Sequence, residues 1–225
     1  MKSGSKRSTS RSPELAAWQH RTLGAVAASS LGREVVFGGG AALAAIHLHH
    51  RTSEDLDFFL TRELEATELA PLVASIRTAA TTTDIEVVGP RTSLILAGRT
   101  RYVGRIDFAF YPFEPVGRRT KWQGLTVESL EDMTVNKLQA VLTRKQPRDF
   151  VDLYFLLREG PFRDLDALLT LVRAKFDTAP HRLGLAARLL LIHEVRELPR
   201  MIRPVTLREL TDFFEERARE LARSE

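Results

Sequence analysis

The stretch VVFGGGAALAAIHLHHRTSEDLDFF, residues 35–59, combines a strand, a glycine turn, a helix and a second strand. Side chains alternate between the two faces of a strand. Asp55 and Asp57 therefore point the same way, while Leu56 and Phe58 point into the core. This order of elements predicts that the chain begins with an α/β arrangement in which two carboxylates share one face of the sheet.

Two carboxylates on one strand face repel each other and lose hydration. A divalent metal ion is the usual compensation, and Mg²⁺ prefers oxygen ligands of this kind. The glycine turn upstream allows the backbone to approach a phosphate, and the following helix presents its positive N-terminal end to it. A phosphate cradle beside a paired-carboxylate metal site predicts phosphoryl or nucleotidyl transfer.

The composition is that of a globular protein. The chain has 225 residues, of which 44% are hydrophobic and 28% charged, so one or two domains are expected. It has no cysteine, which excludes disulfides, thiolate zinc sites and cysteine nucleophiles. The apolar runs are too short to span a membrane, and the N-terminus lacks the apolar core of a secretory signal. We therefore expect a cytoplasmic protein with no membrane partner.

The charge is compatible with nucleic-acid binding but does not require it. The net charge is +4 and the isoelectric point about 9.7. Surplus arginine on a solvated surface is the commoner reason for such values.

Apolar spacing divides the chain into an α/β half and an all-helical half. Strands are expected at 34–37, 55–60, 85–88, 92–97 and 105–111. Helices are expected at 15–30, 41–49, 63–80, 129–144, 148–158, 165–176, 181–198 and 206–223. We therefore expect an α+β fold with three parts: a basic disordered tail over 1–14, a core with a mixed sheet over 15–115, and a helical domain over 116–225.

Asp107 is a candidate third carboxylate. It lies in a strand whose apolar residues Ile106, Phe108 and Phe110 face the other side. An acidic residue there is costly without a partner. If its strand lies beside that of Asp57, the carboxylates converge on one metal site. Taken alone, Asp107 is better explained by a solvated sheet face or by pairing with an arginine.

Lys137 and Asp149 are candidates in the helical half. Lys137 interrupts the apolar stripe of the helix at 129–144, so it either extends to solvent or reaches into a cleft. Asp149 lies in the first turn of the next helix, where negative charge is favoured. Pairing with Arg148 or Arg144 would explain Asp149 without a catalytic role.

Three histidines lie at the end of the helix at 41–49, where protonated imidazole complements the helix dipole. Their spacing does not place His47, His49 and His50 on one ligand face, which argues against a metal site.

Together these motifs resemble the nucleotidyltransferase superfamily, and more narrowly the AbiEii/AbiGii-type (MenT-like) nucleotidyltransferase toxins. Three segments carry the resemblance: GGAALAAIHLHHRTSEDLDFF at 39–59, NKLQAVLTRKQPRDFVDLYFLL at 136–157 and LPRMIRPVTLRELTDFF at 198–214. The second segment is the specific one, because the broad superfamily lacks it. His49, where the family often has a small residue, and the extra Gly38 depart from the family pattern.

The resemblance implies roles for individual residues. It implies catalytic roles for Asp55, Asp57, Lys137 and Asp149. A group of residues is implied to bind the nucleotide: Gly39, Gly40, Arg51, Ser53 and Lys137. The metal ligands it implies are Asp55, Asp57 and Asp107.

The resemblance also implies a fold and an activity. The expected fold is a nucleotidyltransferase core with a mixed sheet, followed by a helical domain that closes the active-site cleft. The expected activity is Mg²⁺-dependent transfer of NMP from an NTP to an acceptor hydroxyl. The resemblance makes tRNA or another RNA the expected acceptor, toxicity the expected outcome and an antitoxin protein a possible partner.

Two other functions remain open from the sequence. One is nucleotidylation of a small molecule, such as an aminoglycoside, or of a protein. The other is a non-catalytic module that binds a nucleotide or RNA. The pair Asp55 and Asp57, together with Lys137, argues against the non-catalytic module.

Overall fold

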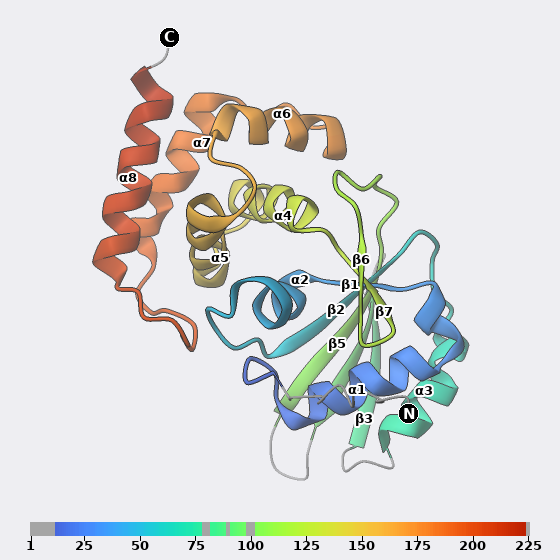
Figure 1. Ribbon diagram of the computed structural model, residues 1–225. Helices are drawn as coiled ribbons and strands as arrows, with labels where there is room; N and C mark the ends of the chain where they lie inside the picture. The colour runs from blue at the N-terminus through green and yellow to red at the C-terminus, as the bar shows by residue number, and fades with distance from the viewer. Residues whose placement is uncertain (1–11, 78–81, 89–90, 98–101, 224–225) are drawn as a thin grey trace, which may run out of the picture.

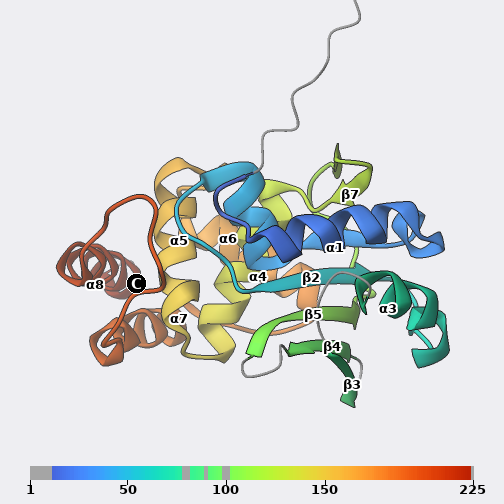
Figure 2. The ribbon, with the colours of Figure 1, turned by 90° about the horizontal axis from the view of Figure 1, so that it is seen from below.

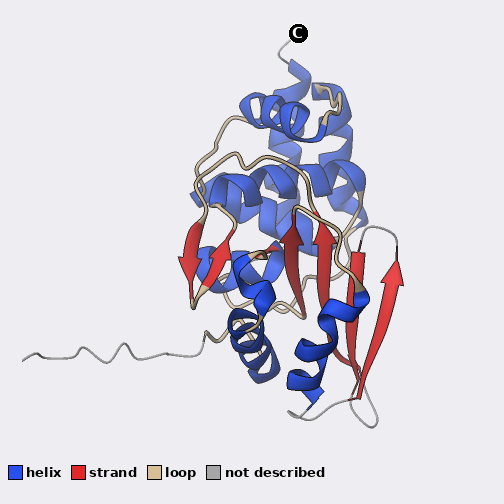
Figure 3. Ribbon diagram, turned by 90° about the vertical axis from the view of Figure 1, so that its right-hand side faces the viewer, coloured by secondary structure: helices blue, strands red, loops and turns tan. Residues whose placement is uncertain are grey.

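A computed structural model describes residues 12–77, 82–88, 91–97 and 102–223 (Figure 1). Its first half is built around a mixed sheet of seven strands, and its second half is helical. Figure 3 shows the helical half stacked on one end of the sheet. The expected α+β class, with a mixed sheet followed by helices, is confirmed.

The sheet has the strand order β3-β4-β5-β2-β1-β7-β6. The strands are β1 (Val36–Gly38), β2 (Asp55–Leu60), β3 (Thr82–Val88), β4 (Arg91–Ala97), β5 (Tyr102–Phe110), β6 (Thr120–Trp122) and β7 (Leu125–Val127). β2 runs parallel to β5, and β1 runs parallel to β7, whereas the other neighbours are antiparallel. The two strands that carry the candidate aspartates are therefore direct neighbours near the middle of the sheet.

The hairpin of β6 and β7 was not expected from the sequence. Each strand has three residues, too few for an alternating pattern to stand out. The turn between them contains Gln123 and Gly124, both with positive φ. Because this hairpin belongs to the sheet, the α/β part continues to Val127, beyond the boundary expected at residue 115.

The helices of the first half surround the sheet. They are α1 (Ala17–Ala28), α2 (Gly39–Ala42) and α3 (Ala70–Arg77), with 3-10 turns at Ser30–Arg33 and Ala66–Leu69. α2 continues as one stretch of π-helix, Leu43–Leu48. The helix expected at 63–80 begins later, as a 3-10 turn, and the end expected for it lies outside the described residues.

Part of the expected disordered tail is ordered. Residues 1–11 lie outside the described residues, but Glu14 is buried and its carboxylate lies 2.8 Å from Nδ1 of His49. The backbone N–H of Ser53 also donates to the carbonyl of Glu14. These contacts attach residues 12–14 to the loop before β2.

The helical half contains five α-helices in the described residues. They are α4 (Leu130–Thr143), α5 (Pro147–Glu159), α6 (Leu165–Phe176), α7 (Arg182–Leu189) and α8 (Leu207–Arg223). The helix expected at 181–198 is shorter, because α7 tightens into a 3-10 turn at Leu190–Glu194. Figure 2 shows α4 and α5 on the side toward the sheet and α8 on the far side.

Aromatic residues form the centres of both halves. Phe58 stacks on Phe108 with ring centroids 5.2 Å apart, and it lies 5.6 Å from Phe37. In the helical half, Phe150 of α5 packs edge-on against Phe214 of α8. None of the described helices combines the length and apolar character that crossing a membrane requires.

Candidate active site

A cavity of about 290 Å³ lies where the helical half meets the sheet. Its walls come from β2 and β5, from the start of α2 and from one side of α4. Most of the site residues expected from the sequence line it: Gly39, Gly40, Arg51, Ser53, Asp55, Asp57, Asp107 and Lys137. Asp149 does not line it. The structure thus brings residues far apart in the chain to one place.

Asp57 and Asp107 are paired in the parallel register of β2 and β5. Their side chains therefore share one sheet face, as the alternation of both strands requires. The carboxylate of Asp57 has no hydrogen bond or ion pair within the described residues. Burial raises the pKa of Asp57, and the nearby carboxylate of Asp107 raises it further. A positive charge beside these two groups would relieve that cost.

Asp107 is almost fully buried and is held by three side chains. Ser93 donates a hydrogen bond of 2.6 Å to it, and Nε of Arg105 lies 3.1 Å from its carboxylate. Arg91 is more distant, at 3.6 Å. Of the explanations considered for Asp107, pairing with arginine is present and a solvated sheet face is not, because the side chain is buried; its place in a metal site stays a prediction, although it lines the cavity with Asp57.

Asp55 lies at the outer edge of the same group. Tyr102 donates a 3.1 Å hydrogen bond to it, and the guanidinium groups of Arg105 and Arg148 lie 3.5 Å and 3.7 Å away. Arginines therefore sit against the oxygens of Asp55 and Asp107 where the sequence predicts a metal ion.

The donor set suits a hard cation, because carboxylate oxygens are the ligands that Mg²⁺ prefers and the carboxylate of Asp57 makes no hydrogen bond or ion pair among the described residues, with Lys137 and Arg148 acting on it only as nearby charges. As arranged here, however, the described acidic and histidine side chains form no group of three or more that could hold a metal ion.

The glycine turn brings the backbone close to the carboxylates. Gly39 has a φ of +64°, which favours glycine, and a side chain there would clash with the carboxylate of Asp57. α2 begins at this residue. A phosphate bound at the turn would thus lie beside Asp57, as the sequence predicts.

Lys137 is buried and reaches into the site. Ser129 caps α4 by accepting from the backbone N–H of Asp132, and Lys137 lies two turns further along. Its ammonium group lies 2.9 Å from Asp149 and 2.7 Å from Asp152. Of the two alternatives considered for Lys137, the structure matches the lysine that reaches into a cleft.

Asp149 is fully buried behind the cavity wall. It accepts hydrogen bonds from Lys137 at 2.9 Å and from Arg144 at 2.7 Å and 3.0 Å. Although burial acts to raise its pKa, the charge of Lys137 and the Arg144 hydrogen bond hold it below its usual range. The predicted pairing with Arg144 is present, whereas Arg148 turns to Asp55 instead. Asp149 therefore positions two cations at the cavity.

Asp152 lies near Asp149 on α5 and, like it, is buried behind the cavity wall rather than lining it. It is fully buried, and Arg51 donates to it through two nitrogens at 2.6 Å and 2.8 Å. Lys137 and Nε2 of His50 lie 2.7 Å from it. Although burial acts to raise its pKa, Arg51 and Lys137 hold it well below the usual range. Asp149 and Asp152 are three residues apart and therefore lie on one face of the helix. This spacing is the feature of the sequence that could have indicated a shared role for the two carboxylates.

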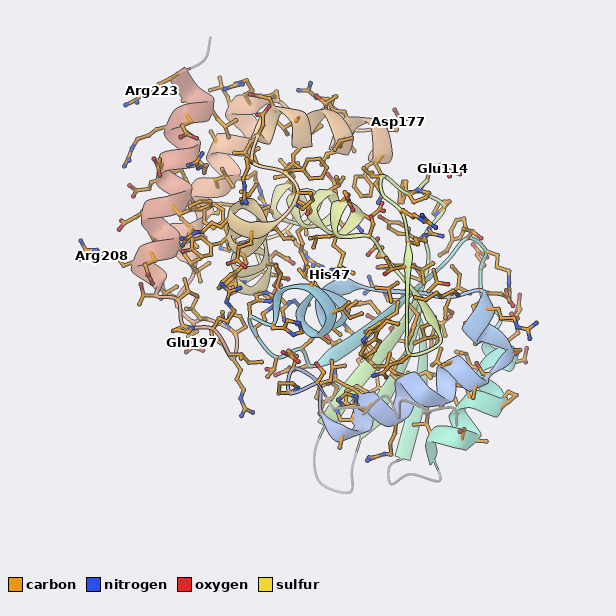
Figure 4. All side chains as sticks on the ribbon, viewed as in Figure 1. His47, Glu114, Asp177, Glu197, Arg208 and Arg223 are labelled. Carbon is orange, nitrogen blue, oxygen red and sulfur yellow. The ribbon has the colours of Figure 1, made fainter. Side chains whose placement is uncertain are left out.

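The three histidine side chains lie in different surroundings, in agreement with their spacing in the sequence. His50 is buried against Asp152, whereas His49 has a left-handed backbone conformation and is turned toward Glu14. His47 lies on the π-helical segment between the sheet and the helical half (Figure 4). Burial lowers the pKa of both His47 and His50, which favours neutral imidazole.

Replacing Lys137 by methionine tests its connection to the site. We expect Lys137→Met to weaken NTP binding, because a cation beside the glycine turn is removed. It should also lower the free energy of unfolding by about 1–3 kcal/mol, since Asp149 and Asp152 each lose a charged partner while keeping an arginine. Calorimetry with NTP and denaturant unfolding measure the two effects. If the affinity for NTP were unchanged, Lys137 would not contact the nucleotide.

Known proteins share this architecture. The structure of JHP933 from Helicobacter pylori aligns over 91% of this chain and 88% of its own, with 16% identity and a TM-score of 0.56. A candidate nucleotidyltransferase from H. pylori aligns over 91% of both chains, with 18% identity and a TM-score of 0.58. At these identities the likeness establishes the fold alone.

Sequence comparison identifies the family. No curated protein matches the chain. A family model described as "Nucleotidyl transferase AbiEii toxin, Type IV TA system" matches residues 21–224, which include both the sheet and the helical half. The chain therefore belongs to the AbiEii family of nucleotidyltransferase toxins.

Proposed function

We propose that this nucleotidyltransferase moves NMP from an NTP to a hydroxyl of RNA, with tRNA as the expected acceptor and Mg²⁺ as the metal. The acceptor oxygen attacks the α-phosphorus, the bond from that phosphorus to the oxygen of the β-phosphate breaks, and pyrophosphate leaves with the electron pair. The proton of the acceptor hydroxyl passes to solvent water, where it can protonate the released pyrophosphate. Atoms and charge balance without a further reactant.

The chain's own residues would bind and orient the triphosphate. Gly39, Gly40 and Ser53 offer backbone or hydroxyl groups, while Arg51 and Lys137 offer positive charge to the departing pyrophosphate. Asp152 holds both cations in place. Well-ordered cations stabilise charge that develops in the transition state without having to reorganise.

Asp55, Asp57 and Asp107 would hold the metal once it replaced the arginines that now lie against Asp55 and Asp107, and it would supply charge neutralisation at the phosphates and activation of the attacking oxygen. The observation that carries the proposal is Asp57: a buried carboxylate with no hydrogen bond or ion pair among the described residues, directly beside Asp107 and the glycine turn. Family membership supports the same assignment.

Arginines around the cavity support an RNA acceptor. The cavity is lined by Arg91, Arg105, Arg144 and Arg148 in addition to Arg51. Arg118 and Lys121 are exposed on the neighbouring segment, whereas Arg99 and Arg101 lie outside the described residues. Guanidinium groups of this kind suit a phosphate backbone.

RNA binding should therefore depend steeply on salt. We expect tRNA affinity to fall as salt rises, and to fall further in the Arg118→Glu, Arg119→Glu double variant, because each neutralised phosphate releases counterions. Filter retention across a salt series measures both. Arg208→Glu, on the exposed face of α8, is the matched control. Absence of tRNA binding at low salt would favour a small-molecule acceptor.

An antitoxin protein is the expected partner, because the family is that of a type IV toxin–antitoxin system. The acceptor is tested by incubating the protein with each α-labelled NTP and, separately, total RNA, an aminoglycoside or a protein mixture. The proposal expects label in the tRNA fraction. Label confined to the aminoglycoside or to protein would contradict it.

A further inference from the structure

The cavity has two chemically different ends. The end described above is charged, with three aspartates and several arginines. The other end is lined by Phe59, Tyr111 and Phe176, together with Glu128, Met133 and Asn136. A nucleotide is divided in the same way, into a charged triphosphate and a planar, weakly polar nucleoside.

The aromatic rings of this second end form a continuous series. Phe59 and Tyr111 lie with ring centroids 4.7 Å apart, Tyr111 and Phe113 4.9 Å apart, and Phe113 and Phe176 4.8 Å apart. Offset and edge-on contacts of this kind hold the rings in fixed orientations. Phe59, Tyr111 and Phe176 of this series line the cavity and give it an aromatic wall against which a heterocycle can pack.

Glu128 is the polar group of this end that lacks a full set of partners. Its exposed fraction is only 4%, and it directly follows β7. Asn136 donates a 2.6 Å hydrogen bond to one carboxyl oxygen, and Tyr111 in turn donates to Asn136 at 2.7 Å. The other carboxyl oxygen has no hydrogen-bond donor within the described part of the chain. Burial raises the pKa of Glu128 to about 7.

Gly38, which precedes the glycine turn, leaves the space through which Glu128 reaches the site. A Cβ at Gly38 would lie 2.6 Å from the second oxygen of Glu128 and would also collide with the ring of Phe59. The free oxygen therefore occupies space left open by Gly38, beside the glycine turn where phosphate is proposed to bind. The extra glycine, a departure from the family pattern, thereby acquires a structural role.

We infer that this second end binds the nucleoside half of the NTP, with Glu128 accepting a hydrogen bond from it and Asn136 and Tyr111 orienting Glu128. The inference rests on the proposed function, because it assumes that an NTP occupies the charged end. The donor is an N–H of the base or a hydroxyl of the ribose, both of which suit a carboxylate acceptor.

Calorimetric titration of Glu128→Gln tests this assignment. The probes are inorganic tripolyphosphate, the four NTPs, and 2′-deoxy and 3′-deoxy ATP, each with Mg²⁺. We expect Glu128→Gln to weaken binding of at least one NTP about tenfold or more, since hydrogen bonds to charged groups are the strong ones. Tripolyphosphate affinity should stay unchanged, because that probe has no nucleoside. Lys137→Met should instead weaken both.

Glu63→Gln is the matched control, because Glu63 is exposed and lies outside the cavity. A thermal melt of Glu128→Gln should show an intact fold, since the change removes a charge whose burial is unfavourable. A loss of affinity for only some of the four NTPs identifies an N–H of the base as the donor. An equal loss for all four NTPs that disappears with one deoxy nucleotide identifies a ribose hydroxyl.

Two results would overturn the inference about the nucleoside site. Only the second of them would also overturn the proposed function. If the native protein binds NTPs and Glu128→Gln binds all of them equally well, the nucleoside lies elsewhere while the proposed function stands. If the native protein binds neither NTPs nor tripolyphosphate, the proposed function fails together with the inference.

Discussion

Asp57→Asn is expected to abolish nucleotide transfer while raising the melting temperature at pH 7. The substitution removes a buried carboxylate that lies beside Asp107 and makes no hydrogen bond or ion pair among the described residues, so it relieves repulsion in the folded state. Activity should fall at least about 100-fold, because charge stabilisation of this kind is worth several kcal/mol. Thermal melts without metal and a transfer assay measure the two effects.

The gain in stability should depend on pH. The pKa of Asp57 in the folded protein is raised above its ordinary value of 3.8, so the folded state holds the proton more tightly than the unfolded state. Proton binding by Asp57 therefore contributes fully to the stability of the native protein below pH 3.8. This contribution is lost as the pH rises through the pKa of Asp57 in the folded protein. Asp57→Asn should therefore melt higher than the native protein at pH 7 but not below pH 3.8. A lower melting temperature at pH 7, with activity retained, would make Asp57 a structural residue.

Asp152→Asn is expected to have the largest effect on stability. Asp152 is fully buried and balances the charges of Arg51 and Lys137. Removing one partner of a buried ionic group leaves uncompensated charge and typically costs about 3–5 kcal/mol. NTP affinity should fall as well, because both cations would lose their fixed positions. Urea unfolding followed by circular dichroism measures the stability change.

Asp212→Asn is the matched control for this measurement. Asp212 is exposed on α8 and forms an i,i+4 pair with Arg208. Exposed pairs of this kind contribute about 0.5 kcal/mol or less. If Asp152→Asn were no more destabilising than Asp212→Asn, Asp152 would not be the centre of the buried network.

The sequence predicts those elements whose pattern is long and regular. The strand at 55–60 and the helix at 165–176 have the expected bounds, because Asp55 and Asp57 alternate with Leu56 and Phe58 in the strand and the apolar residues of the helix follow helical spacing. The site segments were found because glycines and aspartates at fixed spacing imply close backbone approach and shared strand faces. These are local consequences of sequence order.

Features that depend on tertiary packing could not be predicted. The parallel register that sets Asp57 beside Asp107 is a long-range property, and so is the convergence of Arg51 and Lys137 on Asp152. Glu128 gave no sequence signal, because its importance comes from burial at the end of a three-residue strand.

The central claim is that Asp57 belongs to a site that transfers NMP from an NTP to RNA. The most direct test compares α-labelled with γ-labelled NTP, incubated with tRNA and either the native protein or Asp57→Asn. The account predicts that the native protein transfers the α label to tRNA, that the γ label leaves as pyrophosphate, and that Asp57→Asn transfers neither. Transfer of the γ label, or α-label transfer by Asp57→Asn at the native rate, would contradict it.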